Sequence, residues 1–221
     1  MITPNVDQLV KYHKTSNLKL LNTFKNAKYI LPDGQPIVWF SNLFKNSIHT
    51  RLTGSDFFPI FWNYVRLSNK KAGFIISSDQ VGNKLTNEHS NTSFYSPPYF
   101  QLNDSKAFNQ VLKASLLFIS DNKPDFVIIG LGFPKQEYLA LEIMNVYKES
   151  KQKAPFMLLL GASAEFYTKS KQRAPKLFQR IGIEFVHRML TEPRRMLKRY
   201  LIDDLAFISL MWKELKNQLK H

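Results

Sequence analysis

Four short apolar runs recur along the chain and restrict the folds that it can adopt. They are PIVWF (36–40), AGFIIS (72–77), FVIIGL (126–131) and FMLLLGA (156–162). Because these runs are continuous rather than alternating, they are typical of strands that are buried on both faces of a sheet. Longer segments separate them, so the sequence predicts an α/β fold in which helices flank a Rossmann-like, mostly parallel sheet.

Two of the longer segments have the spacing of helices. They are SDFFPIFWNYVRLSNK (55–70) and SKAFNQVLKASLLFISDN (105–122). In the second, Phe108, Val111, Leu112 and Ser115 recur at positions that share one side of a helix. With 44% apolar residues the chain can form a packed core, and we expect one α/β core over residues 1–185.

Three polar or glycine-bearing segments lie next to the predicted strands. GLGFPKQE (130–137) and LLGASAEF (159–166) follow two of the apolar runs, and LPDGQP (31–36) lies beside a third. Open α/β sheets bind ligands beyond the carboxyl ends of their strands. We therefore expect the three segments to converge on one crevice, with the glycines allowing the ligand to approach the backbone.

Taken singly, each segment also has a simpler interpretation. Pro-Asp-Gly at 32–34 is strong β-turn chemistry, although Asp33 in such a turn could serve as a general base. GLGFPKQE is neither a Walker loop nor a full dinucleotide fingerprint. Lys135 within it could meet a phosphate or could simply face solvent.

The charge of the chain points to anionic partners. Lys and Arg outnumber Asp and Glu by 31 to 17, which gives a net charge of +14. Such an excess suits nucleic acid, acidic lipid or phosphorylated small molecules, and it could also serve only solubility. No nucleic-acid recognition motif is present, so we expect no nucleic-acid partner. There is no Cys, which excludes disulfides and thiolate metal sites and fits a cytosolic protein.

The last part of the chain, residues 186–221, is predicted to be a basic, amphipathic helical appendage. Glu192-Pro193 can start a helix, because Pro is tolerated in the first turn. An apolar stripe then follows, with basic residues at its flank. The stripe comprises Met196, Leu197, Tyr200, Leu201, Leu205 and Ile208, and the flanking residues are Arg195, Lys198 and Arg199. The apolar stripe could enter a membrane interface or pack on the protein's own core.

No segment of the sequence is apolar over the roughly 18–20 residues that span a bilayer, and the first residues do not form a signal peptide.

Six motifs in this order resemble the WecG/TagA/CpsF family of bacterial glycosyltransferases. They are TPN (3–5), Asp33-Gly34, RLTGSD (51–56), GLGFPKQE (130–137), RAP (173–175) and EPRRMLKRY (192–200). The match extends over nearly the whole chain, and the ordered agreement of six motifs is far more specific than any one of them.

The resemblance implies an inverting hexosyltransferase that uses a UDP-sugar. The family typically transfers N-acetylmannosamine or its uronic acid to a polyprenyl-diphosphate-linked N-acetylglucosamine, in the synthesis of teichoic acid, capsule or exopolysaccharide. It implies a cytoplasmic, peripheral enzyme on the inner, anionic face of the cell membrane. Self-association into a homo-oligomer and a monomer with a docked tail are both compatible with the family.

The resemblance also implies roles for particular residues. Asp33 matches the family's general base, and Arg51, Arg194, Arg195 and Arg199 are the cations expected to stabilise the leaving diphosphate. The sequence has no Asp-x-Asp pair for a metal ion, so we expect neither a metal site nor a cofactor. The residues expected to bind the substrate are Thr3, Asn5, Gly34, Gly130, Gly132, Lys135, Gln136 and Glu137.

Two departures from the family pattern leave an alternative open. Relatives usually carry another strand and helix before the first motif, whereas this chain begins almost on that motif. A truncated fragment, a misassigned start and a variant without this unit would each explain the difference. GASAEFYTKS (161–170) has Glu165 where the family has Asp, and lacks the Gly that follows. The alternative is a catalytically impaired member that binds nucleotide-sugar or membrane without turnover.

Overall fold

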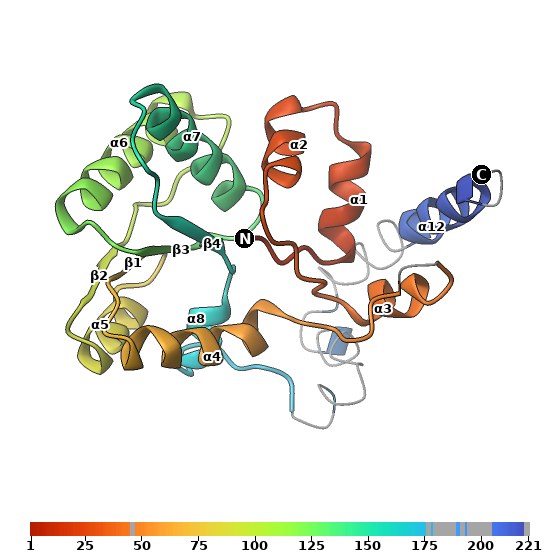
Figure 1. Ribbon diagram of the computed structural model, residues 1–221, viewed down its shortest axis with the longest axis horizontal. Coiled ribbons are helices and arrows are strands. Elements are labelled where there is room, and N and C mark those ends of the chain that lie inside the picture. The colour runs from red at the N-terminus through yellow and green to blue at the C-terminus, as the bar shows by residue number, and fades with distance from the viewer. Residues whose placement is uncertain (45–46, 176–177, 179–188, 191–192, 194–204, 219–221) are drawn as a thin grey trace. The chain divides into compact units, whose positions relative to one another are not determined.

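The computed structural model describes residues 1–44, 47–175, 178, 189–190, 193 and 205–218 (Figure 1). The chain forms two compact units, each assembled from separate segments. The first unit comprises Met1–Ile2, Asn17–Tyr29 and Gly54–Lys171. The second comprises Thr3–Ser16, Ile30–Thr53 and Gln172–His221. The predicted boundary between residues 185 and 186 lies outside the described residues and stays a prediction.

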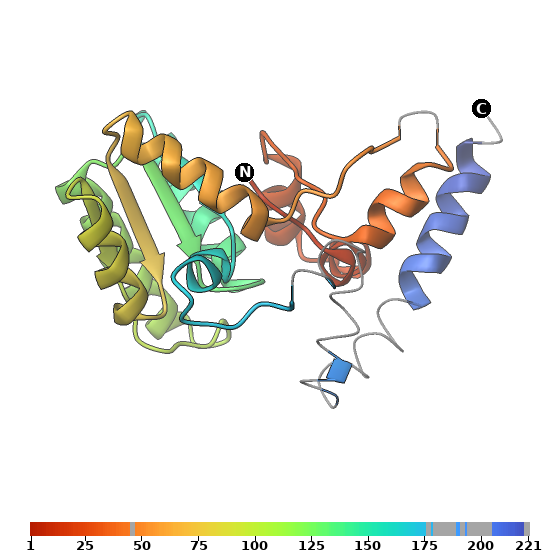
Figure 2. The same cartoon turned by 90° about the horizontal axis from the view of Figure 1, so that it is seen from below.

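The first unit is built on a parallel sheet of four strands, which confirms the predicted α/β class. The strand order is β2-β1-β3-β4, and Figure 2 shows the strands from a second side. The strands are β1 (Ala72–Ile76), β2 (Thr92–Tyr95), β3 (Phe126–Gly130) and β4 (Phe156–Leu159). Beyond β4, Ile2 forms an isolated parallel bridge with Leu159, whose N–H donates to the carbonyl of Met1 at 2.9 Å.

Three of the four apolar runs are strands, and the prediction for the fourth was wrong. Residues 36–40 belong to a helix, α3 (Gln35–Ser41), with a proline in its first turn. In it Val38 is buried while Trp39 is 50% exposed, so the run is one-sided rather than buried on both faces. A short apolar run cannot be assigned to helix or strand by its pattern alone. The sequence also gave no sign of β2, because this edge strand contains Thr92 and Ser93.

Helices cover both faces of the sheet (Figure 1). One face packs against α4 (Gly54–Leu67), α5 (Asp79–Glu88) and α8 (Ser163–Tyr167). The other packs against α6 (Ser105–Asn122) and α7 (Lys135–Glu149), and α2 (Leu18–Lys25) lies against α7. The helices predicted at 55–70 and 105–122 are thus confirmed as α4 and α6.

Successive residues of each inner strand enter opposite cores. Phe74 and Ile76 of β1 pack with α4 and α5, whereas Ile75 between them packs on the α6 and α7 side. Side chains of a strand alternate between faces, so a strand covered on both sides must be apolar at every position. This explains why the apolar runs were continuous.

Glu88 joins the three helices of one face. Its Oε2 accepts hydrogen bonds from Trp62 Nε1 of α4 at 2.7 Å and from the hydroxyl of Tyr167 of α8 at 2.9 Å. Arg66 Nη1 lies 3.5 Å from the same oxygen. Hydrogen bonds to a charged acceptor stabilise more than neutral ones, so this carboxylate fixes α4 and α8 against α5.

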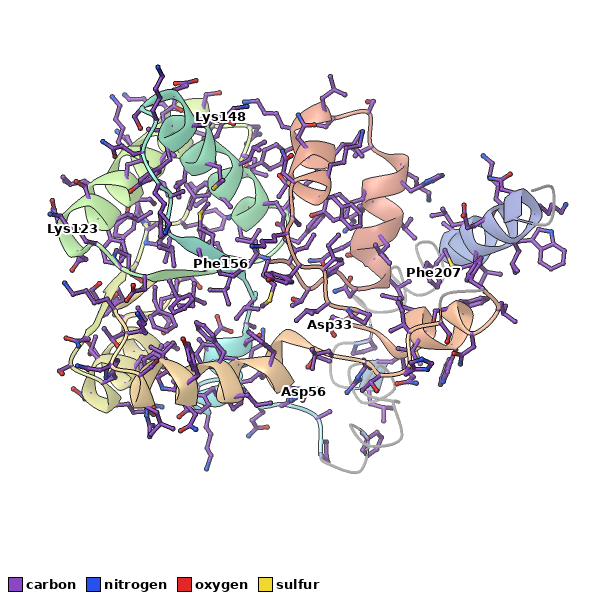
Figure 3. The ribbon with its side chains drawn as sticks, in the orientation of Figure 1. Asp33, Asp56, Lys123, Lys148, Phe156 and Phe207 are labelled. Carbon is purple, nitrogen blue, oxygen red and sulfur yellow. The ribbon has the colours of Figure 1, made fainter. Side chains whose placement is uncertain are left out.

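The second unit contains α1 (Val6–Lys14), α3 and α12 (Leu205–Gln218). Val6 and Val10 of α1 are buried together with Phe207 of α12, which Figure 3 labels. The Phe207 ring meets that of Phe40 edge-on, with the centroids 5.5 Å apart. One side of α12 therefore packs inside its own unit.

Another side of α12 carries exposed apolar residues. Ile208, which belongs to the predicted stripe, is 52% exposed, and Trp212 is 63% exposed. The stripe residues from 196 to 201 lie outside the described part of the chain. No helix within the described ranges is both long enough and apolar enough to cross a bilayer.

Gly82 offers a test of the packing between α5 and the sheet edge. A Cβ at this position would lie 2.4 Å from ring carbons of Phe94 on β2. We expect Gly82→Ala to lower the free energy of unfolding by about 1–3 kcal/mol, because overpacking outweighs the helix propensity of alanine. Urea titration measures it, with the exposed neighbour Asn83→Ala as the control. Equal stability of Gly82→Ala and wild type would contradict this packing.

Candidate functional site

The sheet has a topological switch point between β1 and β3. The chain leaves β1 towards β2 at one edge, and leaves β3 towards β4 at the other. In such sheets the ligand lies beyond the carboxyl ends of the two strands where the direction reverses. The turns at this place are Ser77-Ser78, before α5, and residues 131–134, before α7. The sequence motifs include the second turn but not the first, although two serines directly after an apolar run were a usable signal.

The turns after β3 and β4 approach each other at backbone distance. A Cβ on Gly130 would lie 2.7 Å from the carbonyl oxygen of Gly161, which is closer than side chains come to a backbone oxygen. Gly132 and Gly161 have φ angles of 75° and 54°, a region that favours glycine. The peptide between Phe133 and Pro134 is cis. The glycines therefore shape the backbone of these two turns, and their expected role of admitting a ligand stays a prediction.

Gln136 connects the two turns through its side chain. The Gly161 N–H donates to Gln136 Oε1 at 3.1 Å, and Gln136 Nε2 donates to Glu137 Oε1 at 3.0 Å. Gln136 is 4% exposed. A carboxamide has two N–H groups and two acceptor lone pairs, so one of each remains after these two bonds.

Glu137 is a buried acid with an incomplete set of hydrogen bonds. It is 3% exposed, and its Oε2 has no hydrogen-bond partner among the described residues. Burial raises the pKa of Glu137 from 4.5 to about 7, and the hydrogen bond from Gln136 opposes this rise. The neutral acid is therefore a substantial part of its population near pH 7.

Lys135 contacts aromatic rings from another turn. Its ammonium lies 4.3 Å from the ring centroid of Tyr99 and 4.8 Å from that of Phe100, in the segment between β2 and α6. Cation–π contacts of this kind stabilise by about 0.5–1 kcal/mol at exposed sites. The expected alternatives were a phosphate contact and a solvent-facing charge, and the structure adds a third role, in which Lys135 holds two turns together.

In the second unit, backbone hydrogen bonds bring three predicted motifs side by side. The Asp33 N–H donates to the carbonyl of Pro4 at 3.1 Å, and the Leu52 N–H donates to the carbonyl of Pro32 at 3.0 Å. These bonds place the segments that carry Thr3, Asp33 and Arg51 next to one another. Figure 3 labels Asp33 on the coil before α3.

Two more predicted residues of this unit, Asn5 and Gly34, lie at helix starts. Asn5 is the N-cap of α1, where its side chain accepts from Gln8 N–H at 3.1 Å and its own N–H donates to Gln8 Oε1 at 2.9 Å. This capping box gives Asn5 a role within the fold. Gly34 is the N-cap of α3 in extended backbone, where a Cβ would make only ordinary contacts, the nearest at 3.5 Å.

The predicted tail arginines Arg194, Arg195 and Arg199 lie outside the described residues, so their roles stay predictions. Within the described ranges, no group of three or more His, Asp or Glu side chains is arranged to hold a metal ion.

Comparison with known proteins agrees with the motifs. The model of the family described as "Glycosyl transferase WecG/TagA/CpsF family" matches residues 1–221. A protein of Staphylococcus aureus strain MRSA252, named N-acetylglucosaminyldiphosphoundecaprenol N-acetyl-beta-D-mannosaminyltransferase, is 29% identical over 200 residues, which cover 88% of this chain and 73% of the relative. The protein of the same name from strain NCTC 8325 / PS 47 is 27% identical with the same coverage.

The raised pKa of Glu137 predicts a pH-dependent stability. The native state binds the proton more tightly than the unfolded chain, so stability falls as the pH rises from 4.5 to about 7, by up to about 3 kcal/mol, and then levels off. Glu137→Gln should remove this loss, since its amide does not ionise. Urea unfolding at pH 5 and pH 8 measures it, with the exposed Glu149→Gln on the same helix as control. The same fall in stability for wild type and Glu137→Gln would show that Glu137 does not titrate in this way.

Proposed function

The chain belongs to the Glycosyl transferase WecG/TagA/CpsF family, and we propose that it transfers an N-acetylhexosamine from a UDP-sugar to a polyprenyl-diphosphate-linked N-acetylglucosamine. The sugar is N-acetylmannosamine or its uronic acid. The match of the family over the whole chain carries the proposal, and the names of the two staphylococcal relatives support this acceptor and this sugar. The product enters the synthesis of teichoic acid, capsule or exopolysaccharide.

The first unit has features suited to a nucleotide-sugar. Beyond the carboxyl ends of β3 and β4, its sheet presents two glycine-bearing turns and the start of α7. Backbone N–H groups at such turns attract phosphate oxygens. Among the described residues, Gln136 keeps one N–H and one lone pair after its bonds to Gly161 and Glu137, and these can bind a sugar hydroxyl or the acetamido group.

The proposed reaction is a single displacement with inversion. The Asp33 carboxylate takes the proton of the acceptor hydroxyl while that oxygen forms a bond to the anomeric carbon of the donor sugar. The bond from this carbon to the diphosphate breaks at the same time, and its electron pair leaves on UDP. Thr3 precedes Pro4 and Gly34 follows Asp33 along the chain, and the hydrogen bond between Pro4 and Asp33 holds these two segments together. We assign both residues to substrate binding.

The leaving UDP gains negative charge, which cations stabilise in the transition state. We assign this role to Arg51 and to the tail residues Arg194, Arg195 and Arg199. Guanidinium groups bind phosphate oxygens in a bidentate, charge-assisted manner, so the reaction needs no metal ion in this proposal.

The lipid-linked acceptor places the enzyme at a membrane, as a peripheral protein on the cytoplasmic face. The sequence before α12 is rich in basic residues. The helix itself exposes Ile208 and Trp212, and Lys216 Nζ lies 5.7 Å from the Trp212 ring centroid. An aromatic ring beside a cation suits the headgroup region, where anionic lipids add about 1 kcal/mol per basic residue. Self-association into a homo-oligomer is compatible with this arrangement.

The assay for the proposal is turnover with UDP-N-acetylmannosamine, or its uronic acid, and a polyprenyl-diphosphate N-acetylglucosamine in vesicles of anionic lipid. We expect UDP release together with a lipid-linked disaccharide detected by mass spectrometry. Donor binding without product from either sugar would favour the impaired family member over the enzyme.

Asp33→Asn tests the general base. Loss of the proton acceptor should lower kcat by about 10²–10⁴-fold, the usual contribution of general base catalysis, while the Kd for the donor changes little. The exposed Asp121→Asn on α6 is the matched control and should behave as wild type. If Asp33→Asn turns over at the wild-type rate, Asp33 is not the base.

A chelator tests whether a metal ion takes part. With cations supplied by arginine, turnover in excess EDTA should equal turnover with added Mg²⁺ within the error of the assay. Activity that disappears in EDTA and returns with Mg²⁺ would show that a metal ion is needed.

A further inference from the structure

Glu137 is a buried carboxyl group with few hydrogen bonds, a state that contact with a substrate does not require. It is 3% exposed on the first turn of α7, and a buried carboxyl group costs free energy unless its hydrogen bonds are made. Its Oε1 accepts from Gln136 Nε2 at 3.0 Å, whereas its Oε2 has no partner among the described residues. Besides its own backbone, the hydrogen-bond partner that the described residues give this costly group is therefore its neighbour, Gln136.

The contact with Glu137 sets the orientation of the Gln136 carboxamide. Gly161 N–H is a donor and needs the oxygen of the amide, which lies 3.1 Å away. With the amide rotated by 180°, two donors would face each other at Gly161 and two acceptors would face each other at Glu137. Both partners thus favour one orientation, and together they determine which N–H and which lone pair of Gln136 remain for a ligand.

We propose that Glu137 is a positioning residue, which locks the Gln136 carboxamide and thereby fixes the turn after β4 to the turn after β3. The inference deepens the proposed function and rests on it for the identity of the ligand, a UDP-sugar. It replaces the substrate contact expected for Glu137 by an action through Gln136.

Burial favours the uncharged acid, whereas the hydrogen bond from Gln136 favours the carboxylate, which accepts only and so enforces the amide orientation most strictly. A neutral carboxyl keeps an acceptor at Oε1 for Gln136 and avoids a buried charge. Its arrangement of one acceptor oxygen beside a donor group is also that of a glutamine side chain. Glu137→Gln therefore preserves the lock, and Glu137→Ala removes it. Thr23 Oγ1 lies 3.4 Å from the backbone carbonyl of Glu137, so this contact does not depend on the Glu137 side chain and is kept in both variants.

Steady-state kinetics with the UDP-sugar test the role. We expect Glu137→Ala to lower kcat/KM by about 10–100-fold, the effect of removing an outer partner that orients a binding group. Glu137→Gln should restore most of it. In a Gln136→Ala background the same Glu137→Ala change should cost almost nothing more, because residues that act as a unit are not additive. Glu149→Ala on the same helix is the control and should match wild type.

Three kinetic results would overturn the proposal. They are additive losses in the double variant, a Glu137→Gln variant as impaired as Glu137→Ala, and a Glu137→Ala variant as active as wild type. The second result would mean that the carboxylate itself takes part.

A readout without turnover separates this inference from the proposed function. In the ligand-free protein, the Gly161 amide should shift in ¹H–¹⁵N spectra and exchange faster in Glu137→Ala, and stay near its wild-type position in Glu137→Gln. An unmoved Gly161 amide in Glu137→Ala would contradict the lock even if no UDP-sugar were turned over. A moved amide with no turnover in wild type would instead leave the lock standing and remove the proposed function.

Discussion

The candidate site depends on the close approach of two backbone turns. A Cβ added to Gly130 would lie only 2.7 Å from the carbonyl oxygen of Gly161. Without a side chain at 130, the turns after β3 and β4 come close enough for Gln136 to reach the Gly161 N–H. The parallel pairing of β3 with β4 brings the two turns to the same edge of the sheet. A polar ligand at that edge would meet a surface of backbone groups with a fixed shape.

A small buried polar network holds this surface in place. Buried hydrogen bonds stabilise a site only when their orientation is determined, because a half-satisfied network is costly. Here the backbone of one turn and the carboxyl of Glu137 determine the orientation of a single amide. Lys135 adds cation–π contacts with Tyr99 and Phe100. Neighbouring residues of the motif GLGFPKQE therefore connect the segments that follow β2, β3 and β4.

The sequence predicted the sheet better than the site. Continuous apolar runs revealed β1, β3 and β4, because strands covered on both faces must be apolar throughout. The same rule failed at residues 36–40, which form a one-sided helix, and at β2, an edge strand with polar residues. The motif order selected Gln136 and Glu137 but not their division of roles. That division depends on burial and on the approach of Gly161, 25 residues away from Gln136 along the chain, which no local pattern encodes.

Whether UDP binds at these turns is tested most directly by titrating the ¹⁵N-labelled protein with UDP and recording ¹H–¹⁵N spectra. We expect the largest shifts at the amides of Gly132 and Gly161 and at the side-chain amide of Gln136, while exposed positions at the far end of α7, such as Glu149, stay in place. Saturable shifts that leave all three groups unmoved would contradict binding at these turns, because the nucleotide would then bind elsewhere on the protein.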